Sequence, residues 1–226
     1  MTIPEYSYYL FDVDGTLLDS AGDITSAVRV VFDRRGRGAH LTQEFLRGQI
    51  GRHLEATFRE VFPEYDEEGV KGLIAEYRRE YLGRNHQSTS VYAGVAEALA
   101  MLGGKKSTAT TKGSETTGKV LELFGLRQHF HHVQGTDGFP HKPEPDVLRR
   151  SMEALGARPE ETLMVGDSLV DVEAGRRAGV KVCAVRYGYG ADQIPEDGPD
   201  YWVNDLRELV SSVVRKALET TEAKSA

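Results

Sequence analysis

The stretch Phe11-Asp12-Val13-Asp14-Gly15-Thr16 follows a short apolar run, Tyr8–Leu10, and places two carboxylates two residues apart. The apolar run predicts a buried strand, and Gly15 allows the chain to turn directly after it. Open parallel sheets bind ligands at the carboxyl ends of their strands, so Asp12 and Asp14 are expected to flank one point at that edge. Two carboxylates this close to one ligand need a cation, a proton or both. An acidic turn after a strand is the alternative that this stretch alone leaves open.

Beyond residue 90 the apolar pattern alternates between short strand-like runs and longer helical segments. Together with the first strand, the expected strands are Tyr8–Val13, Lys106–Thr110, His132–Gln134, Thr162–Val165, Val180–Val185 and Tyr201–Val203. The expected helices are Gly94–Leu102, Ser114–Phe124, Pro145–Leu155, Val170–Ala178 and Leu206–Leu218. This alternation is typical of an α/β fold with a doubly wound, mostly parallel sheet.

Residues 21 to about 82 show helical apolar spacing throughout, and no strand is expected among them. The economical interpretation is an α/β core of residues 1–17 and 91–226 into which an all-helical cap, residues 18–90, is inserted. The insertion begins shortly after the two carboxylates and can therefore act as a lid over them. The polar residues 219–226 are expected to form a frayed tail.

Length and charge exclude several classes of protein. A chain of 226 residues can bury one substantial core and a smaller second lobe. The net charge of −7 argues against a nucleic acid or an anionic membrane surface as partner. We expect neither a membrane span nor a signal peptide. Cys183 is the only cysteine, which fits a reducing, cytoplasmic location, and its place in a buried strand indicates packing rather than nucleophilic chemistry.

Thr108-Ala109-Thr110-Thr111-Lys112-Gly113 closes the second strand-like run. Hydroxyl groups at this point can donate to a phosphate oxygen, and the amides before the following helix add affinity for an anion. Threonine is also common in strands, and Lys112 can be an ordinary solvated charge. The run is more polar than a central parallel strand should be.

His141-Lys142-Pro143-Glu144-Pro145 places a lysine directly before a helix start. Pro143 favours an extended backbone at Lys142, and Pro145 suits the first turn of the next helix. A lysine fixed there is well placed as a point charge for a phosphate, with a solvated loop lysine as the alternative.

Met164-Val165-Gly166-Asp167 ends an apolar strand on a carboxylate, and Asp171 follows at the start of a helix. Asp167 can face the same point as Asp12, whereas Asp171 can also serve to cap its own helix. Three or four oxygen ligands without histidine or cysteine suit Mg²⁺ rather than zinc.

Taken in order, these motifs resemble the four motifs of the haloacid dehalogenase superfamily. The matching residues are Asp12-Val13-Asp14-Gly15-Thr16, Thr110, Lys142-Pro143, and Gly166-Asp167 with Asp171. The resemblance covers essentially the whole chain, including the helical cap between the first and second motifs. Three segments look most like the phosphoglycolate phosphatase branch, namely Tyr92–Val95, Ile50-Gly51 and Arg186–Gly190. Thr111-Lys112 departs from the pattern, because relatives usually carry Asn-Lys there.

The resemblance implies a chemical role for the first motif. Asp12 would attack phosphorus to give an aspartyl-phosphate, and Asp14 would protonate the leaving alkoxide and later activate water. Thr110, Thr111 and Lys142 would bind the phosphoryl oxygens.

The resemblance also implies a Mg²⁺ site. Its ligands would come from Asp12, the backbone carbonyl of Asp14, and Asp167, with Asp171 organising the coordination shell.

A Mg²⁺-dependent phosphatase acting on a small phosphorylated molecule is therefore the leading hypothesis. A sugar-phosphate phosphomutase is the nearest alternative, because it uses the same aspartyl-phosphate. A dehalogenase is disfavoured, since it would not need Asp14, and a non-catalytic phosphate-sensing domain is disfavoured because every expected catalytic group is present. The sequence leaves the physiological substrate and the oligomeric state open.

The segment Leu46–Arg52 interrupts the helical pattern of the cap, so we expect a loop that faces the site. Gly51 would allow a close approach to the substrate. Arg47 or Arg52 would pair with a substrate carboxylate, with solvated helix-end charges as the alternative.

Overall fold

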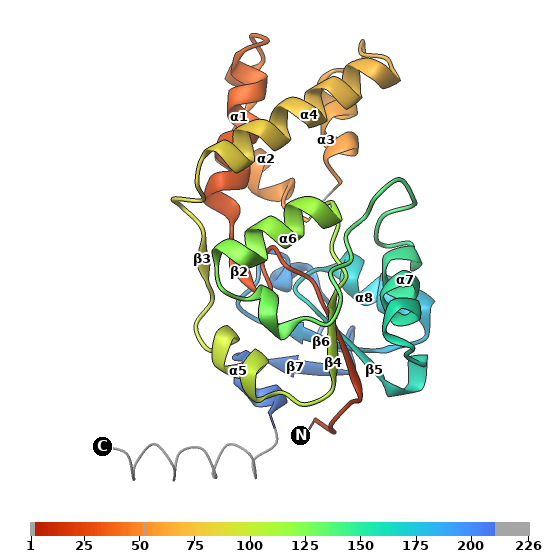
Figure 1. The fold of residues 1–226 in the computed structure, drawn as a ribbon. Helices are drawn as coiled ribbons and strands as arrows, with labels where there is room; N and C mark the ends of the chain where they lie inside the picture. The colour runs from red at the N-terminus through yellow and green to blue at the C-terminus, as the bar shows by residue number, and fades with distance from the viewer. Residues whose placement is uncertain (1–2, 52, 211–226) are drawn as a thin grey trace, which may run out of the picture.

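A five-stranded parallel sheet forms the centre of the computed structural model, which describes residues 3–51 and 53–210 (Figure 1). The strands run in the spatial order β4-β1-β5-β6-β7, and every neighbouring pair is parallel. Their bounds are Tyr8–Phe11 for β1, Lys105–Thr108 for β4, Thr162–Gly166 for β5, Lys181–Val185 for β6 and Tyr201–Val203 for β7. The predicted α/β fold is confirmed. Because all five strands point the same way, their carboxyl ends meet at one edge, with β1 and β5 side by side.

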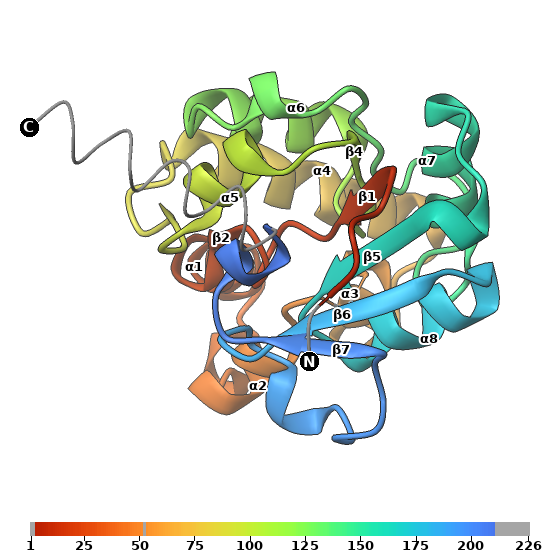
Figure 2. The same cartoon turned by 90° about the horizontal axis from the view of Figure 1, so that it is seen from below.

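Helices cover both faces of this sheet (Figure 2). One face carries α5 (Val95–Met101) and α6 (Ser114–Leu123), and the other carries α7 (Asp146–Leu155) and α8 (Leu169–Ala178). Successive side chains of each strand alternate between the two cores: Tyr9 packs toward α5 and α6, and Leu10 packs toward α7 and α8. Both faces are buried, which explains why the central strands read as continuous apolar runs.

The sequence prediction is wrong for His132–Gln134, which makes only an isolated bridge between Ser107 and His132. The Thr108 hydroxyl donates to the Gln134 carbonyl at 2.9 Å and accepts from the Gln134 amide at 2.8 Å, so a side chain takes the backbone groups that a ladder would need. β4 is consequently an edge strand, which accounts for its polar sequence.

At the other end of the chain, the predicted helix Leu206–Leu218 begins as a 3₁₀ turn, Leu206–Leu209. The remainder of that prediction, from residue 211 onward, and the tail 219–226 lie outside the described residues. Further 3₁₀ turns span Gly38–His40, Arg127–His129, Pro159–Glu161 and Ala191–Gln193.

A group of helices is inserted between β2 (Leu18–Asp19) and β3 (Ser90–Val91). These two short strands pair antiparallel where the chain leaves and re-enters the core, and the sequence pattern did not predict them. The inserted helices are α1 (Ala21–Asp33), α2 (Gln43–Gly48), α3 (Leu54–Val61) and α4 (Glu67–Gly83). Figure 1 shows them above the sheet, on the side of its carboxyl ends.

The inserted helices share an aromatic core. The Phe32 ring of α1 meets Phe58 of α3 edge-on at 5.9 Å and Phe62 at 5.2 Å between centroids, and all three side chains are buried. α4 begins at an Asp66 cap, whose carboxylate accepts from the Gly69 amide at 2.8 Å. No helix among residues 3–51 and 53–210 has the length and apolar character that crossing a bilayer requires.

Candidate active site

The turn of the first motif, at Gly15-Thr16, packs against Asp167 of the last motif. Asp12 directly follows β1, and its amide donates to the Val165 carbonyl of β5 at 2.9 Å, which holds the two strand ends together. Gly15 has a φ of +88°, and a Cβ atom at that position would lie 2.4 Å from Asp167 Oδ2. Only glycine therefore allows the turn after Asp14 to approach Asp167 this closely. The Thr16 hydroxyl donates to Asp167 Oδ1 at 3.2 Å.

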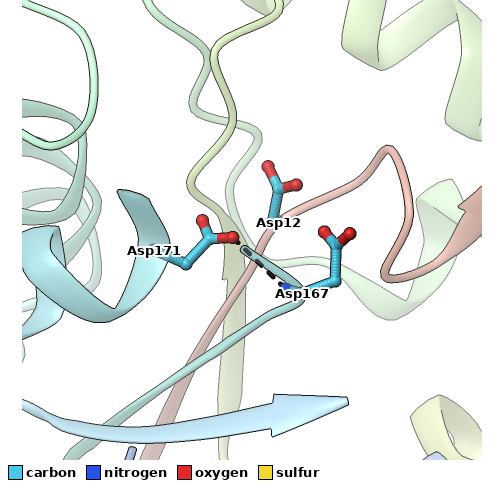
Figure 3. Close-up of side chains that lie close together, drawn as sticks. All are labelled: Asp12, Asp167 and Asp171. Carbon is cyan, nitrogen blue, oxygen red and sulfur yellow. Dashed lines mark hydrogen bonds between the residues drawn. The ribbon is translucent and has the colours of Figure 1, made fainter. Parts of the chain in front are cut away.

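Three buried carboxylates meet at the carboxyl ends of β1 and β5. Asp12, Asp167 and Asp171 each offer an oxygen that lies within 4.8 Å of the others, and their exposed fractions are 5, 3 and 1%. Figure 3 shows the three side chains converging from β1, from the end of β5 and from the first turn of α8. The sequence prediction that Asp12, Asp167 and Asp171 face one point agrees with this geometry.

Asp171 serves two purposes at once. Its Oδ2 accepts from the Asp167 amide at 3.2 Å (dashed line in Figure 3) and from the Ser168 amide at 3.0 Å, which caps the start of α8. Its Oδ1 accepts from Lys142 Nζ at 2.5 Å. Asp171 therefore caps α8 with one oxygen and contacts Lys142 with the other, so the two oxygens have different partners.

Lys142 is buried among the carboxylates. Its ammonium donates to Asp12 Oδ1 at 2.8 Å as well as to Asp171, and the residue is 3% exposed. Burial lowers the pKa of Lys142, but the attraction of Asp12 and Asp171 outweighs it and raises the pKa above the ordinary value. The lysine is therefore charged, and the alternative of a solvated loop lysine is excluded.

The cluster carries a surplus of negative charge. Three carboxylates against one ammonium leave two negative charges uncompensated in a buried site. Burial, only partly offset by Lys142, raises the pKa of Asp12 to about 6. Burial and the charges of Asp171 and Asp12 raise the pKa of Asp167 well above its ordinary value. A divalent cation would remove the surplus.

The donor set fits such a cation. All three ligand candidates are carboxylate oxygens, which Mg²⁺ prefers, and no sulfur or imidazole is among them. Oxygens bound to one Mg²⁺ at about 2.1 Å lie at most about 4.2 Å apart, so the observed limit of 4.8 Å requires only small side-chain shifts.

Asp14 faces a different set of groups from Asp12. Its Oδ1 accepts from the Ser20 hydroxyl at 2.5 Å and from Lys112 Nζ at 3.0 Å. The Lys112 ammonium also donates to the Tyr81 hydroxyl of α4 at 2.8 Å. The side chain of Asp14 is therefore separate from the carboxylate cluster, and Lys112, which can look like a solvated charge in the sequence, has a side chain only 9% exposed.

The two predicted threonines lie at the same sheet edge. Thr110 is buried, and its hydroxyl accepts from the Lys112 amide at 3.3 Å. The register of Phe11 with Thr108 places Ala109 level with Asp12, so Thr110 follows one residue beyond the proposed nucleophile. Thr111 lines a pocket that also contains Asp14.

Two pockets open on either side of Asp14, and the turn Ile50-Gly51 lines both. The first, of about 80 Å³, lies between α4 and the segment after β4. The second, of about 250 Å³, lies beside Asp167 and Leu169 at the start of α8. Gly51 has a φ of +81° and lines both pockets, and its close approach to a substrate stays a prediction.

The predicted cap loop is partly wrong, because Leu46–Gly48 belongs to helix α2. Only residues 49–51 form the turn at the site. Arg47 is therefore a residue of α2 rather than of a loop, and its prediction stays untested because its side chain lies outside what the structure describes. Arg52 lies outside the described residues.

Several site groups escape sequence reasoning. Lys112 had a signal, since it follows the predicted phosphate-binding threonines. Ser20 and Tyr81 had none, because a hydroxyl near an acidic turn or on a helical stripe is common.

Cys183 is buried in the core as predicted, and burial raises the pKa of its thiol far above the ordinary value.

Comparison with known proteins gives consistent results. Residues 9–185 match the family model of haloacid dehalogenase-like hydrolases. The chain is 35% identical to "Pyrophosphatase PpaX" of Halalkalibacterium halodurans, over 94% of this chain and 99% of that protein. It is 34% identical to "Phosphoglycolate phosphatase" of Pseudomonas syringae pv. syringae, over 89% of this chain and 77% of that protein.

A solved structure, a predicted phosphatase from Clostridium acetobutylicum, superposes with a TM-score of 0.80 at 30% identity, covering 96% of this chain and all of that one. The family match extends from β1 to β6 and includes the inserted helices, and the four motifs lie within it. The chain belongs to the haloacid dehalogenase-like hydrolases.

Proposed function

We propose that this protein is a Mg²⁺-dependent phosphatase that hydrolyses a small phosphomonoester through an aspartyl-phosphate on Asp12. The observation that carries the proposal is the buried cluster at the carboxyl edge of β1 and β5. There a charged lysine contacts Asp12, and two negative charges remain uncompensated. The names of the relatives support the same reaction class.

In the first half-reaction, an Asp12 oxygen attacks phosphorus while the bond from phosphorus to the leaving oxygen breaks. Asp14, two residues further along, supplies the proton that the leaving alkoxide takes up. Lys142, freed from one of its carboxylates, and the Thr110 hydroxyl bind the phosphoryl oxygens. In the second half-reaction, Asp14 removes a proton from the water that attacks phosphorus, which releases phosphate and regenerates the Asp12 carboxylate.

Electrostatics require the cations. A phosphate dianion about 4 Å from two carboxylates makes four repulsive unit pairs of roughly 4 kcal/mol each at an effective dielectric of 20, about 16 kcal/mol in all. Asp12, Asp167 and Asp171 would hold Mg²⁺, together with the backbone carbonyl of Asp14. When bound, the metal supplies positive charge that offsets this repulsion and polarises the phosphoryl group. Lys142 adds one further positive charge beside the nucleophile.

The inserted helices, residues 18–90, act in this proposal as a cap that closes over the site. A pocket of about 80 Å³ beside Asp14 is well below the roughly 300–1,000 Å³ of pockets for drug-sized ligands. The substrate is accordingly a small molecule such as phosphoglycolate. Inorganic pyrophosphate is the second candidate, because a relative of nearly equal length carries the name of a pyrophosphatase.

The test is hydrolysis of a panel containing phosphoglycolate, pyrophosphate, sugar phosphates and an aryl phosphate, after EDTA treatment and after addition of Mg²⁺ or Ca²⁺. We expect activity with Mg²⁺ only, because the larger and looser shell of Ca²⁺ misplaces nucleophile and phosphorus. Asp12→Asn should remove turnover while leaving the circular dichroism spectrum unchanged.

Full activity in metal-stripped protein, or near-wild-type turnover in Asp12→Asn, would contradict the mechanism. Product analysis separates a phosphatase, which releases inorganic phosphate, from a phosphomutase, which returns the phosphoryl group to a second hydroxyl.

A further inference from the structure

The two pockets beside Asp14 differ in charge. The larger one is lined by the carboxylates of Asp14 and Asp167 and has no lysine, arginine or histidine among its lining residues in the described chain. The smaller one is also lined by Asp14, but it adds three basic side chains, His53, Arg78 and Lys112. A leaving group with a negative charge of its own would be repelled from the larger pocket and attracted into the smaller one.

Of the three basic side chains, two are unsuited to a second anion. Lys112 is already paired with Asp14 at 3.0 Å. The His53 ring stacks on His141 at 4.6 Å between centroids. Burial, followed by repulsion from His141, lowers the pKa of His53, so its ring is neutral near pH 7.

Arg78, in contrast, is suited to bind a second anion. It lies on α4, lines the smaller pocket, and forms no hydrogen bond or ion pair with any residue of 3–51 and 53–210. Its Nη2 lies 3.6 Å from the position that a Cβ atom on Gly113 would occupy, so the guanidinium reaches across the pocket to the turn after Lys112. A planar guanidinium can donate two parallel hydrogen bonds to a carboxylate or a phosphoryl group.

The start of helix α6, which borders this pocket, already has a carboxylate partner. α6 begins at Ser114, whose amide already donates to both oxygens of Asp137, at 3.1 and 3.2 Å. The first turn of that helix therefore has its own carboxylate, and the charge that remains for a ligand is the side chain of Arg78.

We propose that Arg78 determines specificity, by pairing with a second anionic group on the substrate while the first phosphoryl group lies at Asp12. This inference rests on the proposed phosphatase function. The sequence analysis predicted that Arg47 or Arg52 pairs with a substrate carboxylate, and this proposal places that pairing on α4 instead. The substrate class is a phosphomonoester with an anionic group a few atoms away, or pyrophosphate, and both present two acceptor oxygens on one atom to the guanidinium.

The test compares kcat/KM for phosphoglycolate, pyrophosphate and ethyl phosphate, which lacks a second charge, in the presence of Mg²⁺. Arg78→Ala should lower the preference for an anionic substrate over ethyl phosphate by about 10- to 100-fold, mainly through KM, since a charged hydrogen-bonded pair is lost. Arg78→Lys should be intermediate, because it keeps the charge and loses the paired geometry. The anionic substrate that loses more identifies the group that Arg78 binds.

Arg79→Ala is the matched control. Arg79 is the next residue of the same helix and is exposed, as Arg78 is, but it lines neither of these pockets. Its removal should leave the preference unchanged, and thermal unfolding should confirm that both variants are folded.

Three outcomes would overturn the inference. They are an equal loss on all substrates in Arg78→Ala, the same change of preference in Arg79→Ala, and a wild-type enzyme without preference for the anionic substrates. In each of these cases the phosphatase proposal stands. A wild-type protein that hydrolyses none of the substrates would instead overturn the proposed function, and this inference with it.

Discussion

Lys112 and Asp14 form an ion pair, with 3.0 Å between Nζ and Oδ1, and the same ammonium donates to the Tyr81 hydroxyl at 2.8 Å. One lysine thus joins the proposed acid–base carboxylate, which follows β1, to α4 of the inserted helices. The position of Asp14 is consequently coupled to the packing of α4 over the sheet edge, although Asp14 and Tyr81 are far apart in the sequence.

This pair leads to a prediction for Lys112→Met. Removing the lysine leaves Asp14 with Ser20 as its partner and withdraws a positive charge from a poorly exposed carboxylate. We expect kcat for an alkyl phosphate to fall by about 30-fold or more, since truncating one member of a buried charged pair typically costs at least about 2 kcal/mol. Steady-state kinetics measure the effect.

Lys119→Met is the matched control, because that lysine of α6 pairs with Glu115 at the exposed surface. We expect it to retain wild-type kinetics. If Lys112→Met also retains wild-type kcat, the ion pair has no part in turnover.

Asp14→Asn should distinguish the role of Asp14 from that of Asp12, because the loss of activity should depend on the leaving group of the substrate. A general acid contributes roughly 10²- to 10⁴-fold, and alkyl alkoxides need the proton more than aryl oxides do. The variant should therefore lose much more activity on an alkyl phosphate than on p-nitrophenyl phosphate. Measuring kcat for both substrates tests this, and equal losses would contradict the acid role of Asp14.

Asp167→Asn should stabilise the metal-free protein. Burial and the neighbouring Asp171 and Asp12 raise the pKa of Asp167, and the charge of Lys142 offsets only part of this rise. Its charge therefore opposes folding at neutral pH, and neutral asparagine should raise the melting temperature in EDTA by a few degrees, at about 2–4 °C per kcal/mol. Mg²⁺ should then stabilise the wild type but not the variant.

Calorimetry with and without Mg²⁺ measures both effects, and Asp192→Asn, at an exposed position, is the control. An Asp167→Asn variant that still gains the full Mg²⁺ stabilisation would show that Asp167 is not a ligand.

The Mg²⁺-induced stabilisation should itself depend on pH. Because burial raises the pKa of Asp12 to about 6, above its unfolded value of roughly 3.9, the folded metal-free protein holds this proton between about pH 4 and 6. The contribution of Asp12 to stability is therefore present at low pH and is lost as pH rises through about 6. Mg²⁺ competes with that proton, so the rise in melting temperature on adding Mg²⁺ should be smaller at pH 5 than at pH 7.5. A rise independent of pH would argue against a metal bound through Asp12.

The α/β fold and the position of the carboxylate cluster could both be predicted from the amino-acid sequence. Apolar runs that end in Asp12 and Asp167 fix the strand ends locally, and parallel pairing of β1 with β5 necessarily brings those ends to one edge. Gly15 could likewise be interpreted from the sequence, because a sharp turn after the strand needs a positive φ. The error at His132–Gln134 has a local cause too, since the Thr108 hydroxyl takes the backbone groups of Gln134.

The partners of the remaining charged side chains could not be predicted, because they depend on contacts between segments that are distant in the sequence. Asp12 and Asp14 differ by two residues, yet one meets Lys142 and the other Lys112, because the chain turns between them. Arg78 follows Tyr77, which belongs to the buried stripe of α4. The helical pattern identifies the buried face of α4, but it does not say which residues contact the side chains at the edge of that face. Those contacts depend on how α4 is rotated about its axis against the edge of the sheet. Side-chain packing between segments distant in the sequence sets this rotation, and no local periodicity encodes it.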